Sequence, residues 1–152
     1  MAAFVERISV SKLDAAKRQL HTAVRLWFDD GDPVAIHSLV SAAHEIIHTL
    51  FRRKGLKGLL FDSPGIPDEL RTVFAQAVVS AANAFKHARH DPDGVTEFAP
   101  GFNDYLLWIC VAGLWRMGEP FAIEEAAIIV WLAIQRAPWV VQMAGDRLPA
   151  VD

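Results

Sequence analysis

The sequence predicts an all-α bundle of about five helices. Apolar residues recur at three- and four-residue spacing through most of the chain, which is the period of one helix face. The breaks between these stretches carry glycine, proline and aspartate, which are typical of turns and helix caps. The 152 residues, 53% of them hydrophobic, suit a single helical domain over residues 1–152 and exclude a disordered chain.

The first two helices are expected over about residues 11–29 and 33–54. The first carries an apolar stripe at helical spacing, with basic residues such as Arg18 off the stripe. The second opens at Asp32, an N-cap residue, followed by Pro33 at the first helical position. The N–H that proline lacks has no partner at that position in any helix.

The middle of the chain combines a loop, a third helix and a turn. Residues 55–67 hold glycines and prolines that break a helix and leucines that favour docking on the core. A third helix is expected over residues 68–89, and the sequence Asp-Pro-Asp-Gly at 91–94 ends it in a turn. Residues 4–10 and 95–98 alternate in part, which predicts a minor two-stranded β ribbon.

Two apolar helices complete the predicted bundle. Asn103 or Asp104 caps the fourth helix, which continues to Met117. The fifth is expected over residues 121–141, disturbed at Pro138, whose ring clashes with the preceding turn.

Helices four and five are apolar nearly all round, and they hold four of the five tryptophans: Trp108, Trp115, Trp131 and Trp139. A helix that is apolar on every side is either central or covered by a partner. One small bundle has little interior for two such helices, so we expect a homo-oligomer formed through these Trp-rich C-terminal helices. The alternative is a five-helix monomer in which loops cover the excess.

Composition narrows the function classes. The net charge of −3, from 15 basic and 18 acidic residues, makes a nucleic-acid partner unlikely on electrostatic grounds. The single cysteine, Cys110, lies in the apolar run 106–115 and is expected to be a small core residue. That run is much shorter than the roughly 20 residues that span a bilayer. Residues 1–12 lack the apolar stretch of a secretory signal, so we expect a cytoplasmic protein without a membrane partner.

Residues 44–48 have the pattern H-E-x-x-H on the second predicted helix. Residues four apart share a helix face, so His44 and His48 can both reach one Zn²⁺ while Glu45 polarises a bound water. The motif resembles that of zinc-dependent metallopeptidases of the thermolysin kind, which implies two metal ligands, His44 and His48, and a general base, Glu45. The resemblance covers five residues. No glycine and third histidine follow at metzincin spacing, so a third ligand has to come from elsewhere in the fold.

The same two histidines continue a polar stripe that begins at His37 and Ser41 and borders the apolar face of the helix. Histidines at such a boundary commonly bond water or nearby backbone, which is the alternative to a metal site. His87 or His90 of the third helix could complete a site only if that helix turned its polar side inward.

A second polar group closes the third predicted helix and consists of Asn83, Lys86 and His87, followed by Asp91 and Asp93. Cations near a helix C-terminus complement its negative dipole end, an explanation that needs no ligand. The functional alternative is a nucleotide or phosphate site, in which Lys86 and His87 face an anion and Asn83 contacts a base or sugar edge.

The order of the predicted helices and their capping residues resembles that of a second group of proteins. An amphipathic helix, a second helix opened by Asp32 and Pro33, and a third ended by Asn83-x-x-Lys86-His87 resemble small uncharacterised bacterial all-helical proteins. More distantly, they are similar to HEPN (higher eukaryotes and prokaryotes nucleotide-binding) domains. The resemblance covers about residues 10–95 and implies a helical bundle with a dimeric or nucleotide-related role. HEPN ribonucleases carry an arginine, four to six residues and then a histidine. No histidine here follows an arginine at that distance, which argues against ribonuclease activity.

These patterns favour a cytoplasmic binding or assembly module that self-associates over an enzyme. The enzyme alternative is a zinc-dependent hydrolase that uses His44, His48 and Glu45. The second alternative is an HEPN-like domain with a nucleotide or nucleic-acid role centred on Asn83, Lys86 and His87.

Overall fold

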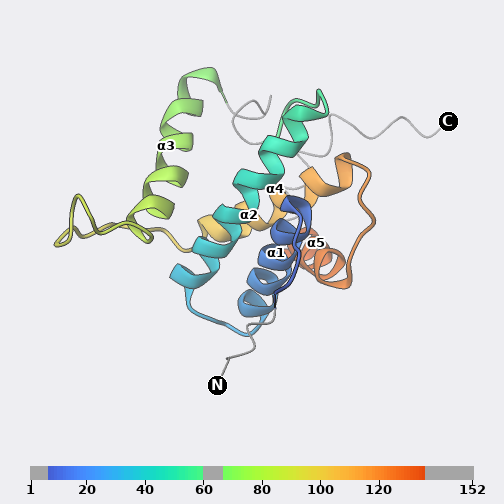
Figure 1. The fold of residues 1–152 in the computed structure, drawn as a ribbon, viewed down its shortest axis with the longest axis horizontal. Coiled ribbons are helices and arrows are strands. Elements are labelled where there is room, and N and C mark those ends of the chain that lie inside the picture. Colours follow the sequence, from blue (N-terminus) through green and yellow to red (C-terminus); the bar gives the residue numbers. More distant parts are fainter. Residues whose placement is uncertain (1–6, 60–66, 136–152) are drawn as a thin grey trace.

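The computed structural model describes residues 7–59 and 67–135, and within them the chain forms an all-α bundle (Figure 1). The predicted fold class is therefore confirmed. The helices of the described part are α1 (Lys12–Phe28), α2 (Pro33–Arg53), α3 (Asp68–Ala84), α4 (Phe102–Arg116) and α5 (Ile123–Gln135).

The first two helices begin at side-chain caps. The hydroxyl of Ser11 accepts a hydrogen bond of 3.0 Å from the backbone N–H of Asp14. The carboxylate of Asp32 accepts from the N–H groups of Val34 and Ala35 at 2.9 and 3.0 Å. These bonds satisfy N–H groups that have no partner inside the helix, which explains why both helices start at the predicted residues.

Four helices share the core, and α3 lies at its edge. α2 packs against both α1 and α4, and α5 contacts those same two helices. In the described chain α3 packs against α2 alone, and Figure 1 shows it to one side of the other helices. Apolar side chains on its first half are consequently exposed, with Leu70 at 53% and Val73 at 62%.

Helices α2 and α4 pack closely against each other at Gly113. A Cβ added at Gly113 of α4 would lie 2.8 Å from a methyl carbon of Ile47, so only glycine lets the two helices approach this far. The buried thiol of Cys110 lies beside them, as expected of a small core residue. The largest fully buried apolar side chains are Leu20, Ile47, Phe51, Leu106, Leu107, Ile109, Leu114, Ile128 and Leu132.

By length and composition alone, α2 could span a membrane. The core helix of a soluble protein passes the same test, and the apolar face of α2 is buried against α1 and α4.

A row of polar contacts holds α5 and the chain before it against α1. Each contact joins a side chain of α1 to a glutamate: Lys17 to Glu119, His21 to Glu125, and Arg25 to Glu124. Glu125 is only 1% exposed, and its Oε1 lies 2.8 Å from His21 Nε2. A buried carboxylate needs a partner, and this contact supplies it on the side of α5 that also buries Ile128 and Leu132.

The loop after α2 docks on the core as predicted. Leu59 is 4% exposed, and the partly buried Leu56 packs against the core. The guanidinium of Arg116 donates to the carbonyls of Gly58 and Lys57 at 2.8 and 2.7 Å, which ties the loop to α4. Later residues of the predicted loop, 60–66, lie outside the described part.

Three boundaries differ from the prediction. α4 begins after Gly101, so neither Asn103 nor Asp104 is its cap, and its first N–H groups bond the preceding loop carbonyls instead. α3 ends at Ala84, five residues before the predicted end, where the N–H groups of Lys86 and His87 both bond the Asn83 carbonyl and the Phe85 ring packs on His37. α5 starts at Ile123, and residues 136–141, including Pro138, lie outside the described chain.

The predicted β ribbon is wrong for the residues that the structure describes. Residues 7–10 and 95–98 are irregular, and Val95 is 96% exposed. Phe98 packs instead against His37, with ring centroids 4.7 Å apart. Two isolated strands are marginal in water, whereas burying an aromatic ring is favourable. The predicted turn at residues 91–94 does form, with Gly94 N–H donating to the Asp91 carbonyl at 3.3 Å.

Candidate functional site

The polar stripe of α2 lies inside the molecule. His37, Ser41 and His44 are buried, with exposures of 1%, 9% and 4%, and His48 is partly buried. The ring of His37 contacts Phe85, which follows α3, and Phe98 of the next loop. This end of the stripe therefore faces neighbouring segments, which is possible because the stripe borders the apolar face of the helix.

A hydrogen-bonded chain holds His37 in place. Its Nδ1 lies 2.9 Å from Oδ1 of Asn103, and Nδ2 of Asn103 donates to the Pro33 carbonyl at 3.0 Å. An amide oxygen only accepts, so Nδ1 of His37 carries the proton. Burial lowers the pKa of His37, and the bonds to Asn103 and the Val78 backbone oppose that effect. The sequence predicted Asn103 only as a helix cap, because no local pattern pairs it with a histidine 66 residues away.

His44 and His48 lie side by side on one face of α2. Their ring centroids are 5.7 Å apart, with 26° between the ring planes. Burial, and then the charge on His48, lowers the pKa of His44 to about 4. Its ring is therefore neutral at physiological pH, the form in which imidazole binds a metal.

The H-E-x-x-H hypothesis also requires a general base, Glu45, and a third metal ligand. Glu45 is exposed, whereas His44 beside it is buried. Within residues 7–59 and 67–135, no three His, Cys, Asp or Glu side chains are grouped so that they could hold a metal ion. Zinc sites use three or four protein ligands, and this pair supplies two.

Asn83, Lys86 and His87 are brought together at the C-terminal end of α3, and all three are exposed. The carbonyl of Asn83 accepts from the backbone N–H groups of Lys86 and His87 at 3.1 and 3.0 Å, which forms the final turn after the helix. The cations thus lie near the negative end of the helix dipole. The nucleotide hypothesis stays a prediction, and a nucleotide titration that gave neither heat nor a shift in Tm would contradict it.

The exposed apolar residues of the described chain include a group on α4, α5 and the loop between them. Trp115 is 61% exposed, and its ring stacks on Phe121 with centroids 6.2 Å apart. On α5, Ile123, Val130 and Ile134 are 81%, 58% and 70% exposed. We call these five residues the α5 patch.

Comparisons with protein-family models, with curated proteins and with solved structures found no match to this chain. The fold defines the chain as an all-α bundle, and any function has to be argued from its own surfaces and side chains.

Proposed function

We propose that this protein is a binding or assembly module that self-associates through the α5 patch. The observation that carries the proposal is the pattern of exposure along α5. Ile123, Ala127, Val130 and Ile134 are all exposed and follow one another at spacings of four, three and four residues.

That spacing is the seam of a helix that pairs with another helix. The opposite side of α5 is already used, because Glu125, Ile128 and Leu132 are buried against the bundle. No charged residue interrupts residues 126–134. The small Ala127 among three branched residues allows two such helices to approach closely, and a twofold axis would place the same surface on both copies. A second copy of this chain is therefore the occupant that we propose.

The test measures molar mass by light scattering across a range of micromolar protein concentrations. Wild-type protein is expected to associate, and Val130→Lys to be monomeric, because the charge has to be desolvated at the centre of the seam. Trp115→Arg is expected to weaken association as well. Val95→Lys is the matched control, since Val95 is 96% exposed but lies in the loop before α4, away from the patch.

Trp131→Arg is less suitable as a test. The ring of Trp131 packs on Trp27 with centroids 4.4 Å apart, so its loss also disturbs the bundle. A wild type that remains monomeric at high micromolar concentration would refute the proposal. Cover by the chain's own residues 136–152, which include Trp139, would produce that result.

A second candidate function is a zinc-dependent hydrolase. It is favoured by the neutral His44 ring beside His48 on one helix face. His44 and His48 would be ligands and Glu45 the general base, with the third ligand supplied from outside the described residues. Elemental analysis of untagged protein tests it: near-stoichiometric zinc that is lost in His44→Ala would support it. Protein without zinc, whose Tm does not rise when zinc is added, would exclude it.

A further inference from the structure

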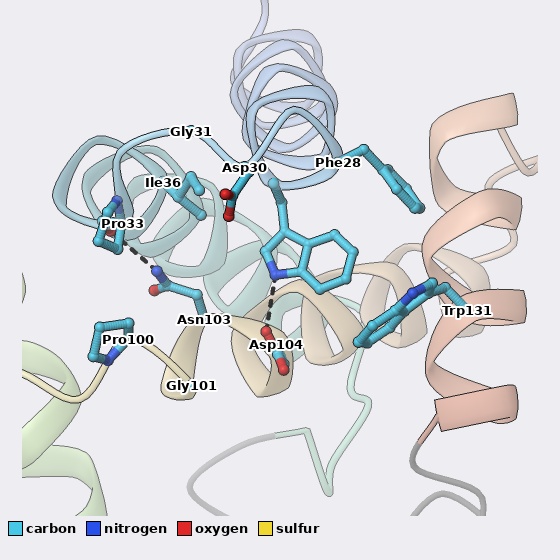
Figure 2. A pocket seen from close by; sticks show the side chains of 11 residues that line it. Phe28, Asp30, Gly31, Pro33, Ile36, Pro100, Gly101, Asn103, Asp104 and Trp131 are labelled. Carbon is cyan, nitrogen blue, oxygen red and sulfur yellow. Dashed lines mark hydrogen bonds between the residues drawn. The ribbon is translucent and has the colours of Figure 1, made fainter.

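A pocket of about 510 Å³ opens where three helix ends meet (Figure 2). The C-terminus of α1 and the N-termini of α2 and α4 form its walls, and Trp131 of α5 closes one side. Its volume falls within the range typical of small-molecule sites. None of the residues assigned to the polar stripe of α2 or to the α5 patch lines it.

Aromatic rings form one part of this pocket. Trp27 and Trp131 meet edge to face with centroids 4.4 Å apart, and Phe28 meets Trp27 edge to face at 5.1 Å. The indole N–H of Trp27 donates to Asp104 Oδ1 at 2.9 Å. This bond orients the indole and places a carboxylate next to it, as Figure 2 shows for Asp104.

Among the described residues that line the pocket, the charged side chains are Asp30 and Asp104, and none is a lysine, arginine or histidine. Two helix N-termini would ordinarily attract an anion. Here Asp32 already caps α2, and Asp104 lies in the first turn of α4, so acidic side chains of the chain itself offset both positive ends.

Asp30 occupies a backbone position that favours glycine. In the described part of the chain, three helices end in the same way, with the residue after the C-cap in the left-handed region. That residue is Gly55 after α2 (φ 75°) and Gly118 after α4 (φ 85°), but it is Asp30 after α1 (φ 53°). The closing bonds around Asp30 run from its own N–H to the Trp27 carbonyl at 3.3 Å and from Gly31 N–H to the Leu26 carbonyl at 2.7 Å.

Aspartate is unfavourable at this position for two reasons. A side chain costs energy at positive φ, although less for aspartate than for most residues. A negative charge also repels the negative end of the α1 dipole. A cation bound in the pocket would offset that repulsion, and the aromatic rings would add a cation–π attraction.

From these observations we infer that the pocket binds a small organic cation of the alkylammonium class. Asp30 would supply its counter-charge, and Trp27, Trp131 and Phe28 the aromatic surface against its methyl or methylene groups. This site is independent of the proposed self-association, since it uses the helix ends rather than the α5 patch.

Choline is the probe, and its neutral counterpart of the same shape, 3,3-dimethylbutan-1-ol, is the matched ligand control. Binding is measured by calorimetry and by the NMR shifts of the tryptophan indole N–H groups. Choline is expected to bind saturably and to move the resonances of Trp27 and Trp131. The neutral alcohol is expected to bind at least about fivefold more weakly, because an ion attraction of about 1 kcal/mol is missing.

Two substitutions of Asp30 separate binding from folding. Asp30→Asn keeps a residue that tolerates the left-handed region and removes the charge, so choline affinity should fall about fivefold. Asp30→Gly should weaken binding similarly while raising Tm by about 3 °C, since glycine fits this helix end better. Asp29→Asn is the control, because Asp29 is the neighbouring carboxylate but does not line the pocket.

Three results would overturn the inference. The first is an absence of saturable choline binding to folded wild-type protein, and the second is equal affinity for the neutral alcohol. The third is an equal loss in Asp29→Asn and Asp30→Asn, which would indicate general surface charge. Molar mass measured on the same samples keeps this test separate from the self-association proposal.

Discussion

Acidification should destabilise this protein through His44, which lies near the middle of α2 and is 4% exposed. Burial, and secondly His48, lowers the pKa of His44 from 6.5 to about 4. Between these two values the unfolded chain binds a proton at this residue and the folded chain does not. The free energy of unfolding therefore falls as the pH falls. The whole difference corresponds to roughly 3 kcal/mol, and below about pH 4 it does not grow further.

Urea unfolding of chelator-treated protein, followed from neutral pH down to about pH 4, measures this effect. His44→Leu removes the titrating ring and keeps a side chain of comparable size. Over this range the wild type should lose roughly 3 kcal/mol more than the variant does. His87→Leu is the control for the change of residue type, because it replaces a histidine that is exposed.

Two results would refute this reasoning. One is a His44→Leu variant that keeps the wild-type slope between pH 6.5 and about 4. The other is an NMR titration of the folded protein in which His44 changes charge near its ordinary pKa. Carboxylates that titrate in the same range are present in both proteins, so they cancel in the comparison.

Three further outcomes follow from the packing and the charges. Gly113→Ala should lower stability by about 1–3 kcal/mol, because the new methyl would lie 2.8 Å from Ile47; a midpoint of urea unfolding equal to that of the wild type would contradict this. The hydrogen bond from Arg25 lowers the pKa of Glu124, so this pair stabilises the fold above the unfolded-state pKa and stops doing so as the pH falls through the lowered value. Glu124→Gln should therefore flatten the acid side of the stability curve, and an unchanged curve would refute the contribution. Val130→Lys should reduce the molar mass while the chain remains folded, since Val130 is 58% exposed in the bundle.

The starts of α1 and α2 could be predicted because they depend on local chemistry. Asp32 caps α2 through bonds to N–H groups two and three residues away, and the proline after it belongs at a first helical position. The loop after α2 was predictable for a related reason. Its glycines break the helix, and leucines such as Leu59 have to be buried somewhere.

Other features depend on residues far apart in the chain, and no local pattern contains them. α3 ends at Ala84 rather than near Arg89, and the Phe85 ring that follows it packs on His37, which lies 48 residues earlier in the sequence. The predicted β ribbon is absent from the described residues for a similar reason, since Phe98 also packs on His37. Helical period alone placed the apolar stripe of α3 but did not show that its first half would remain uncovered.

The same distinction between local and long-range features applies to the candidate sites. Spacing by itself put His44 and His48 on one helix face, and helical geometry ensures that they meet. Only the packing of α2 inside the bundle decided that His44 is buried and neutral while Glu45 is exposed. The pocket beside Asp30 could not be foreseen, because it is built from the ends of α1, α2 and α4 and from Trp131 of α5.

The sequence by itself thus determined the all-α class, the cap of α2 and the shared face of the two histidines, because hydrogen bonds and side-chain spacing within a few residues specify them. Tertiary structure decided which histidine loses its charge, which side of α5 remains exposed and where the aromatic rings meet the carboxylates. Burial and electrostatic environment are properties of segments brought together from distant parts of the chain, and they exist only once the bundle has packed.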